Sequence, residues 1–180
     1  MVNAFKLIIL CLAAMDGRVT CLETLFEQFE QFSGFEIVDM KLRVRKFNRT
    51  MMTLNGTIYI RQPMNNDLVF HTDLFYSRLG NQQFNHYPVK MPTSGFCDFF
   101  DHMHNVYEDH IKDIVNVPQL NECPVKVRQA HILDKVFPSS VLPAFCPTGL
   151  WKIIISGRLH EEEKLSYHMV LKVYENNYFG

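Results

Sequence analysis

Apolar and charged side chains alternate without interruption along Val38-Asp39-Met40-Lys41-Leu42-Arg43-Val44-Arg45. Successive side chains of a β-strand point to opposite faces of the sheet, so this period of two predicts a half-buried strand. The aliphatic and methionine side chains would face a core, while the Lys and Arg side chains would face solvent. The stretch therefore indicates a β protein.

The same alternation recurs along most of the chain. Met52, Leu54, Ile58 and Ile60 share one predicted face of a second strand, and polar residues occupy the other face. Later segments repeat the pattern, and the last two form a hairpin around a charged turn. Together the segments predict strands at residues 52–61, 68–78, 84–91, 125–133, 151–159 and 165–173.

The spacing of large apolar residues changes to that of a helix after residue 95. The residues at this spacing are Phe96, Phe99, Phe100, Met103, Tyr107, Ile111 and Ile114. They predict one α-helix over residues 95–115, with Thr93 or Ser94 as its N-cap and Pro118 beyond its end. We therefore expect one mainly β domain over residues 21–180: an antiparallel β-sandwich or β-cup with a single helix.

Composition and motifs argue against several classes of function. The 18 Lys and Arg residues are balanced by 19 Asp and Glu residues, so no nucleic-acid partner is expected. The chain has no Gly-rich phosphate loop, Gly-x-Ser-x-Gly or Cys-x-x-Cys motif. His102 and His104 would diverge by about 200° on a helix and could not share a metal ion. We predict no catalytic residue, no cofactor and no metal site.

The N-terminal residues are typical of a secretory signal. Lys6 precedes the apolar run Leu7–Met15, which is too short to cross a bilayer. We predict a signal peptide over residues 1–20, cleaved between Met15 and Cys21, and a secreted product that does not insert stably into membranes. Asn48 and Asn55 each begin an Asn-x-Thr sequon and are predicted glycosylation sites.

Four cysteines remain once the predicted signal is removed: Cys21, Cys97, Cys123 and Cys146. An even number in a small secreted chain implies a disulfide framework. We expect Cys97–Cys123, which would clamp the helix against the sheet, and Cys21–Cys146. The pairing of Cys21 with Cys97 and of Cys123 with Cys146 remains open at this point.

Three motifs suggest a family: Gly95-Phe96-Cys97-Asp98-Phe99-Phe100, Asn121-Glu122-Cys123-Pro124, and Leu142-Pro143 followed by Pro147, Gly149 and Trp151. Together they resemble a group of small secreted insect proteins that includes the CheB chemosensory proteins. That group is similar, more distantly, to the ganglioside activator and other ML lipid-recognition domains. The resemblance implies a β-cup whose sheets separate to admit a lipid or other apolar molecule, with chemosensation as a biological setting.

Two functional hypotheses follow. The first is a secreted, non-enzymatic protein that carries or presents a lipid or another hydrophobic small molecule, with an extracellular receptor as a further partner. The 15 Phe and nine Met residues would suit an adaptable apolar wall. The second is an extracellular protein–protein interaction module with a solid core and no ligand. The predicted wall residues are Met52, Leu54, Ile58, Phe70, Phe75, Trp151, Ile153 and Met169.

Overall fold

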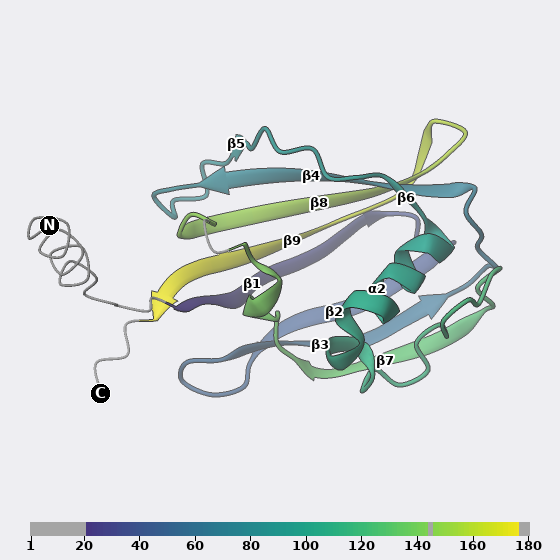
Figure 1. The fold of residues 1–180 in the computed structure, drawn as a ribbon, viewed down its shortest axis with the longest axis horizontal. Helices are drawn as coiled ribbons and strands as arrows, with labels where there is room; N and C mark the ends of the chain where they lie inside the picture. Colours follow the sequence, from purple (N-terminus) through teal and green to yellow (C-terminus); the bar gives the residue numbers. More distant parts are fainter. Residues whose placement is uncertain (1–20, 144–145, 177–180) are drawn as a thin grey trace, which may run out of the picture.

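The computed structural model describes residues 21–143 and 146–176, so the predicted signal peptide lies outside the described residues. Within these ranges the chain forms two antiparallel sheets, one α-helix and a short 3-10 turn (Figure 1). This arrangement confirms the predicted mainly β fold with a single helix.

The larger sheet has the strand order β1-β9-β8-β4-β5, and β6 also pairs with β4. Strands β8 and β9 form the predicted C-terminal hairpin, which turns at His160 and Glu161. The bounds are β1 Cys21–Ser33, β4 Leu68–Ser77, β5 Asn85–His86, β6 Ser94–Gly95, β8 Gly149–Leu159 and β9 Glu162–Asn176.

The smaller sheet has the strand order β2-β3-β7. Its strands are β2 (Val38–Lys46), β3 (Met52–Ile60) and β7 (Arg128–Lys135). Val38 pairs with Ile60, and the alternation continues in register to Lys46 opposite Met52. The apolar positions of β2 and β3 therefore share the inner face, as the sequence predicted.

Two predicted strands differ from the observed ones. The segment predicted as residues 84–91 pairs only at β5, because Pro88 lacks an amide proton and the chain leaves the sheet edge. The segment predicted as residues 125–133 pairs along β7 instead, three residues later at its start. Val125 forms only an isolated bridge with Met64.

Strand β1 was not predicted, because its apolar residues do not alternate. Its pairing with β9 shifts between Phe26 and Gln28, where one extra residue forms a bulge. Phe26 then faces Leu171 and Phe29 faces Met169, so both rings lie on the same side of the sheet despite their odd separation.

The edges of the two sheets meet where β1 is followed by β2. Nε2 of Gln31 donates to the backbone oxygens of Val38 (2.6 Å) and Ser33 (2.9 Å). The backbone N–H of Met40 donates to Oε1 of Gln31 (2.7 Å). One half-buried amide side chain therefore joins the two sheets along this side.

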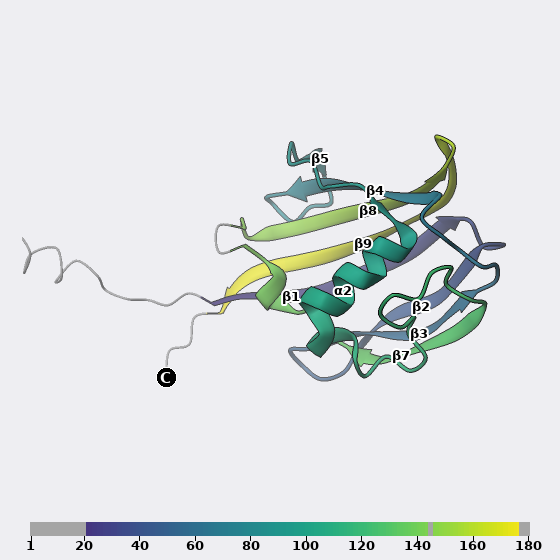
Figure 2. The ribbon, with the colours of Figure 1, turned by 45° about the vertical axis from the view of Figure 1, so that its right-hand side comes forward.

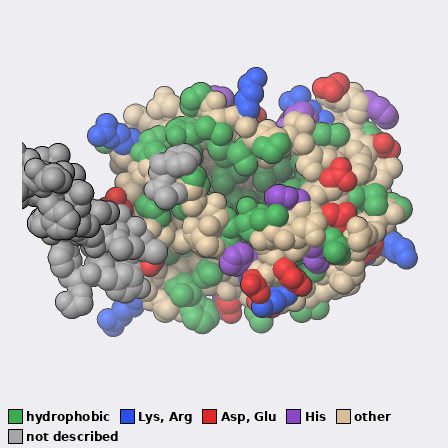
Figure 3. Space-filling model, in the orientation of Figure 1, with side chains coloured by type: hydrophobic (Ala, Val, Ile, Leu, Met, Phe, Trp, Pro, Cys, Tyr) green, Lys and Arg blue, Asp and Glu red, His purple; other side chains and the backbone are tan. Residues whose placement is uncertain are grey.

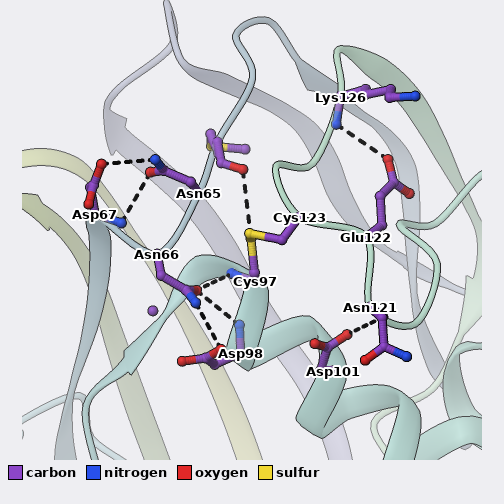
Figure 4. Close-up of a disulfide and its surroundings, with 12 residues drawn as sticks. Asn65, Asn66, Asp67, Cys97, Asp98, Asp101, Asn121, Glu122, Cys123 and Lys126 are labelled. Atoms are coloured by element: carbon purple, nitrogen blue, oxygen red, sulfur yellow. Dashed lines mark hydrogen bonds between the residues drawn. A yellow bond between two sulfur atoms is a disulfide. The ribbon is translucent and has the colours of Figure 1, made fainter.

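Helix α2 (Phe96–Ile111) spans the opposite side, between the larger sheet and the strand β7 that follows it in sequence (Figures 1 and 2). Its first turn is capped by Asn66, whose Oδ1 accepts from the backbone N–H of Cys97 (2.9 Å) and of Asp98 (3.1 Å) (Figure 4). The predicted caps Thr93 and Ser94 are therefore wrong.

Two further features define this helix. A disulfide joins Cys97, in its first turn, to Cys123 in the loop before β7 (Figure 4). This confirms one expected pairing and excludes the alternative one. The helical backbone is interrupted at Tyr107, where φ is −125° and ψ is 27°.

Candidate functional site: a cavity between the sheets

An apolar cavity of about 200 Å³ lies between the sheets, beneath α2. Figure 3 shows hydrophobic side chains gathered in a hollow near the middle of the face on which α2 lies. The cavity is lined by Val38, Met40, Ile58, Ile60, Phe70, Phe96, Phe99, Phe100, Met103, Ile111, Ile114, Val117, Leu165 and Tyr167.

Each wall of the cavity comes from an element whose sequence pattern aims apolar side chains inward. Alternate residues of β2 and β3 supply the floor, and Phe70, Leu165 and Tyr167 supply the wall from the larger sheet. Helix α2 contributes residues spaced three and four apart, which lie on one face of a helix. Three packed rings, Phe96, Phe99 and Phe70, join the helix to the sheet.

The lining carries no charged side chain, and Tyr167 is its only polar residue. Burial raises the pKa of the Tyr167 phenol well above its ordinary value, because the apolar surroundings disfavour the phenolate. The cavity is therefore suited to an uncharged apolar guest, with one hydroxyl available for a hydrogen bond.

The structure divides the eight predicted wall residues into three groups. Ile58 and Phe70 line the cavity. Four others belong to a second apolar cluster, centred on Phe26 and Leu171, toward the other end of the strands. These four are Met52, Leu54, Ile153 and Met169.

Trp151 and Phe75 make up the third group, which neither lines the cavity nor belongs to that cluster, and they lie on opposite faces of the larger sheet. The Trp151 ring packs against Tyr76 and Tyr87, with centroids 4.8 and 4.7 Å apart, and its Nε1 donates to the backbone oxygen of Pro147 (2.9 Å). Phe75 is an odd number of residues from Phe70 and so points to the outer face, where it contacts His86.

Sequence reasoning missed most of the cavity wall as a ligand site. The helix residues were recognised only as an apolar stripe, and Leu165 and Tyr167 only as one face of a strand. A useful signal was the breadth of that stripe, since Phe96, Phe99 and Phe100 offer more apolar surface than one sheet edge requires. The strand residues that this helical stripe packs against are then candidates for the rest of the cavity wall.

The remaining predicted sites have varied surroundings. Cys146 is unbonded in the structure, and the side chain of Cys21 lies outside the described residues, so their pairing stays a prediction.

The two predicted glycosylation sites differ in exposure: Asn48 is exposed, whereas Asn55 is only 7% exposed. Nδ2 of Asn55 donates to Oγ1 of Thr53 (3.1 Å) and Oδ1 of Asp134 (2.9 Å). A glycan on Asn55 conflicts with this environment.

Two kinds of feature are absent from the part of the chain that the structure describes. It contains no group of three or more His, Cys, Asp or Glu side chains placed to hold a metal ion. It also contains no helix with the length and apolar content needed to cross a bilayer.

Comparison of the chain with protein-family models gives no match, and comparison with curated protein sequences gives none either.

Proposed function

We propose that this protein is a non-enzymatic binding protein that takes up a hydrophobic small molecule, or the apolar part of a lipid, between its two sheets. The observation that carries the proposal is the cavity beneath α2, whose lining is apolar except for one phenol. Removing apolar surface from water would drive uptake at roughly 25 cal/mol per Å², less the cost of association.

The size of the cavity limits the guest. A cavity of about 150 Å³ can hold benzene, and common ligand sites exceed about 300 Å³. The observed space of about 200 Å³ therefore suits one ring or a short chain. Ile155, an inner-face residue that packs against the same core as the cavity wall, is only half-buried, so a longer guest has apolar surface to follow.

The proposal includes secretion and an extracellular role. It is supported by the apolar run Leu7–Met15 and by the Cys97–Cys123 disulfide, a bond that persists mainly in oxidising compartments. The resemblance to the CheB group supports a setting in chemosensation, with an extracellular receptor as partner. Of the two sequons, the exposed Asn48 is the one that carries a glycan under this proposal.

Uptake of a neutral, environment-sensitive dye with a single ring, such as 4-(dimethylamino)benzonitrile, tests the binding function, because a cavity of about 200 Å³ suits one ring. Ile58→Trp should fill the cavity and abolish uptake, because Ile58 lines it. The matched control is Leu133→Trp, at a side chain on β7 that is 72% exposed, and it should leave uptake unchanged. A wild-type protein that takes up no dye would favour the solid-core interaction module instead.

Secretion and glycosylation are tested together by expressing the full chain in a eukaryotic cell. The mature protein should begin between residues 16 and 21 and should lose mass on treatment with an N-glycosidase. Asn48→Gln should remove that mass change, because the Asn55 amide is held by Thr53 and Asp134. A glycosidase-sensitive mass that persists in Asn48→Gln would place a glycan on Asn55.

A further inference from the structure

The cavity contains one polar group, the hydroxyl of Tyr167. Tyr167 lies on the inner face of the larger sheet, between Gln31 of β1 and Ile155 of β8. Its ring packs against Phe29, with centroids 5.8 Å apart. The other thirteen lining residues are aliphatic side chains, methionines and phenylalanines.

This hydroxyl has no hydrogen-bond partner among the described residues, unlike two other tyrosines of the same sheet. The Tyr76 hydroxyl donates to the backbone oxygen of Thr148 (2.8 Å), and the Tyr174 hydroxyl donates to Oε2 of Glu23 (2.9 Å). Gln31, which faces Tyr167 across the strands, already uses its amide on the β1 and β2 backbones. A hydroxyl that lines an apolar cavity without a protein partner is free to donate to a ligand acceptor.

The surroundings of Tyr167 also decide which partner it suits. Burial raises the pKa of the phenol, so it stays protonated in neutral solution and is a ready hydrogen-bond donor. No Lys, Arg, His, Asp or Glu side chain lines the cavity. A charged guest would therefore lose its hydration without finding an opposite charge, which is costly. A neutral guest with one accepting oxygen fits both conditions.

We propose that the cavity selects neutral apolar molecules that carry a single carbonyl oxygen, as in a ketone, aldehyde or ester, and that Tyr167 donates a hydrogen bond to that oxygen. This inference rests on the proposed function and names the ligand class of the same site. The oxygen fixes the orientation of the guest, and the apolar remainder fills the space between α2 and the sheets.

A pair of probes that differ only at the oxygen tests the proposal. Acetophenone and α-methylstyrene have nearly the same size and connectivity, with a carbonyl oxygen in one and a methylene group in the other. Their affinities are measured by dye displacement for the wild type, for Tyr167→Phe and for Tyr59→Phe. Tyr59 alternates with Ile58 and Ile60 on β3 and so faces outward, which makes it a matched control.

Tyr167→Phe should weaken acetophenone binding by about threefold to tenfold, the range expected for one net hydrogen bond. It should change α-methylstyrene binding by less than about twofold, because the hydrocarbon has nothing to accept the proton. Tyr59→Phe should change neither affinity. Equal effects of Tyr167→Phe on both probes would overturn the inference while leaving the proposed function intact.

The carbonyl stretch of bound acetophenone provides a readout that a merely structural role would not move. It should shift to lower frequency in the wild type, relative to acetophenone in alkane, and the shift should disappear in Tyr167→Phe. An unshifted band in the wild type would overturn the inference without any variant. If neither probe binds the wild type and no dye is taken up, the proposed function itself fails.

Discussion

The two ends of the space between the sheets are closed in different ways. At one end Phe26, Leu54 and Leu171 form a buried cluster, and Phe137 from the segment after β7 packs edge-on against Phe26 with centroids 5.9 Å apart. At the other end α2 lies over the sheets and leaves a cavity. The extended segment inserts a single ring into the space, whereas the helix crosses it as a wider element.

This difference shows why one inner face yields both a core and a cavity. Both ends are lined by the same kinds of side chain, from the same strands. Oγ1 of Thr24 donates to the backbone oxygen of Phe137 (2.8 Å), which holds the extended segment close to β1. Helix α2 is about 10 Å wide and cannot follow the sheets as closely. The residual space therefore lies beneath the helix.

The largest expected effect is a difference in the stability lost on truncating a side chain at each of the two ends. Leu171→Ala should lower the free energy of unfolding by about 4 kcal/mol, because Leu171 is 1% exposed within the packed cluster. Ile58→Ala should cost about 2 kcal/mol, because Ile58 already faces empty space and has fewer contacts to lose. Urea unfolding measures both values. Equal losses would mean that the two ends are packed alike.

The next effect concerns how α2 is held over the cavity. Replacing both Cys97 and Cys123 with Ala should lower the free energy of unfolding by about 3 kcal/mol, because the bond closes a loop with a sequence separation of 26. Non-reducing urea unfolding measures the loss. The control is Val106→Ala, at a side chain on α2 that is 55% exposed, and it should cost under about 1 kcal/mol. A loss for the double variant as small as that of the control would contradict this stabilising role.

A smaller effect is expected at the first turn of α2. Asn66→Ala should cost about 1 kcal/mol, because the backbone N–H groups of Cys97 and Asp98 would lose their acceptor. Hydrogen exchange at these two amides should become faster, while exchange near Leu171 should not change. Asn65→Ala is the control, as its side chain bonds only Asp67. Similar exchange in both variants would contradict the capping role.

The smallest expected effect is a pH dependence of stability. It arises on the outer face of the larger sheet, outside both the cluster and the cavity. His168 is buried, and desolvation followed by the charge of Lys152 lowers its pKa below the ordinary 6.5. Between the folded pKa and 6.5 the unfolded chain binds more protons, so stability should fall as pH falls through this window. His168→Gln should flatten that dependence, while the exposed His160→Gln should not. A dependence unchanged in His168→Gln would assign it to other groups.

The face of each strand could be predicted from sequence, but its position along the cavity could not. Alternation correctly placed Ile58 and Leu54 on one inner face, since the pleat alone sets that face. It could not tell that Ile58 lies beneath α2 and Leu54 beside Phe26, because crossing elements from distant sequence decide this. The predicted ligand wall was therefore spread over both ends.

Strand β1 and the cap of α2 were beyond sequence reasoning for related reasons. A bulge after Phe26 removes the period of two on which strand prediction depends. The cap comes from Asn66, about thirty residues before the helix, and Gly95 stands at the N-cap because a Cβ there would lie 2.5 Å from Oδ1 of Asn66. Local capping rules cannot find a partner that only the folded chain brings near.

The hydrogen bonds of the Gln31 amide determine at which edge the two sheets can separate. Its hydrogen bonds link the edge strands β1 and β2. Separating the sheets at this edge would break these hydrogen bonds together. At the opposite margin α2 is fixed at Cys97 by the disulfide, and its backbone is interrupted at Tyr107. Under the proposed function, we therefore expect a guest larger than the cavity to displace the helical segment beyond Tyr107 and to leave the β1–β2 edge in place.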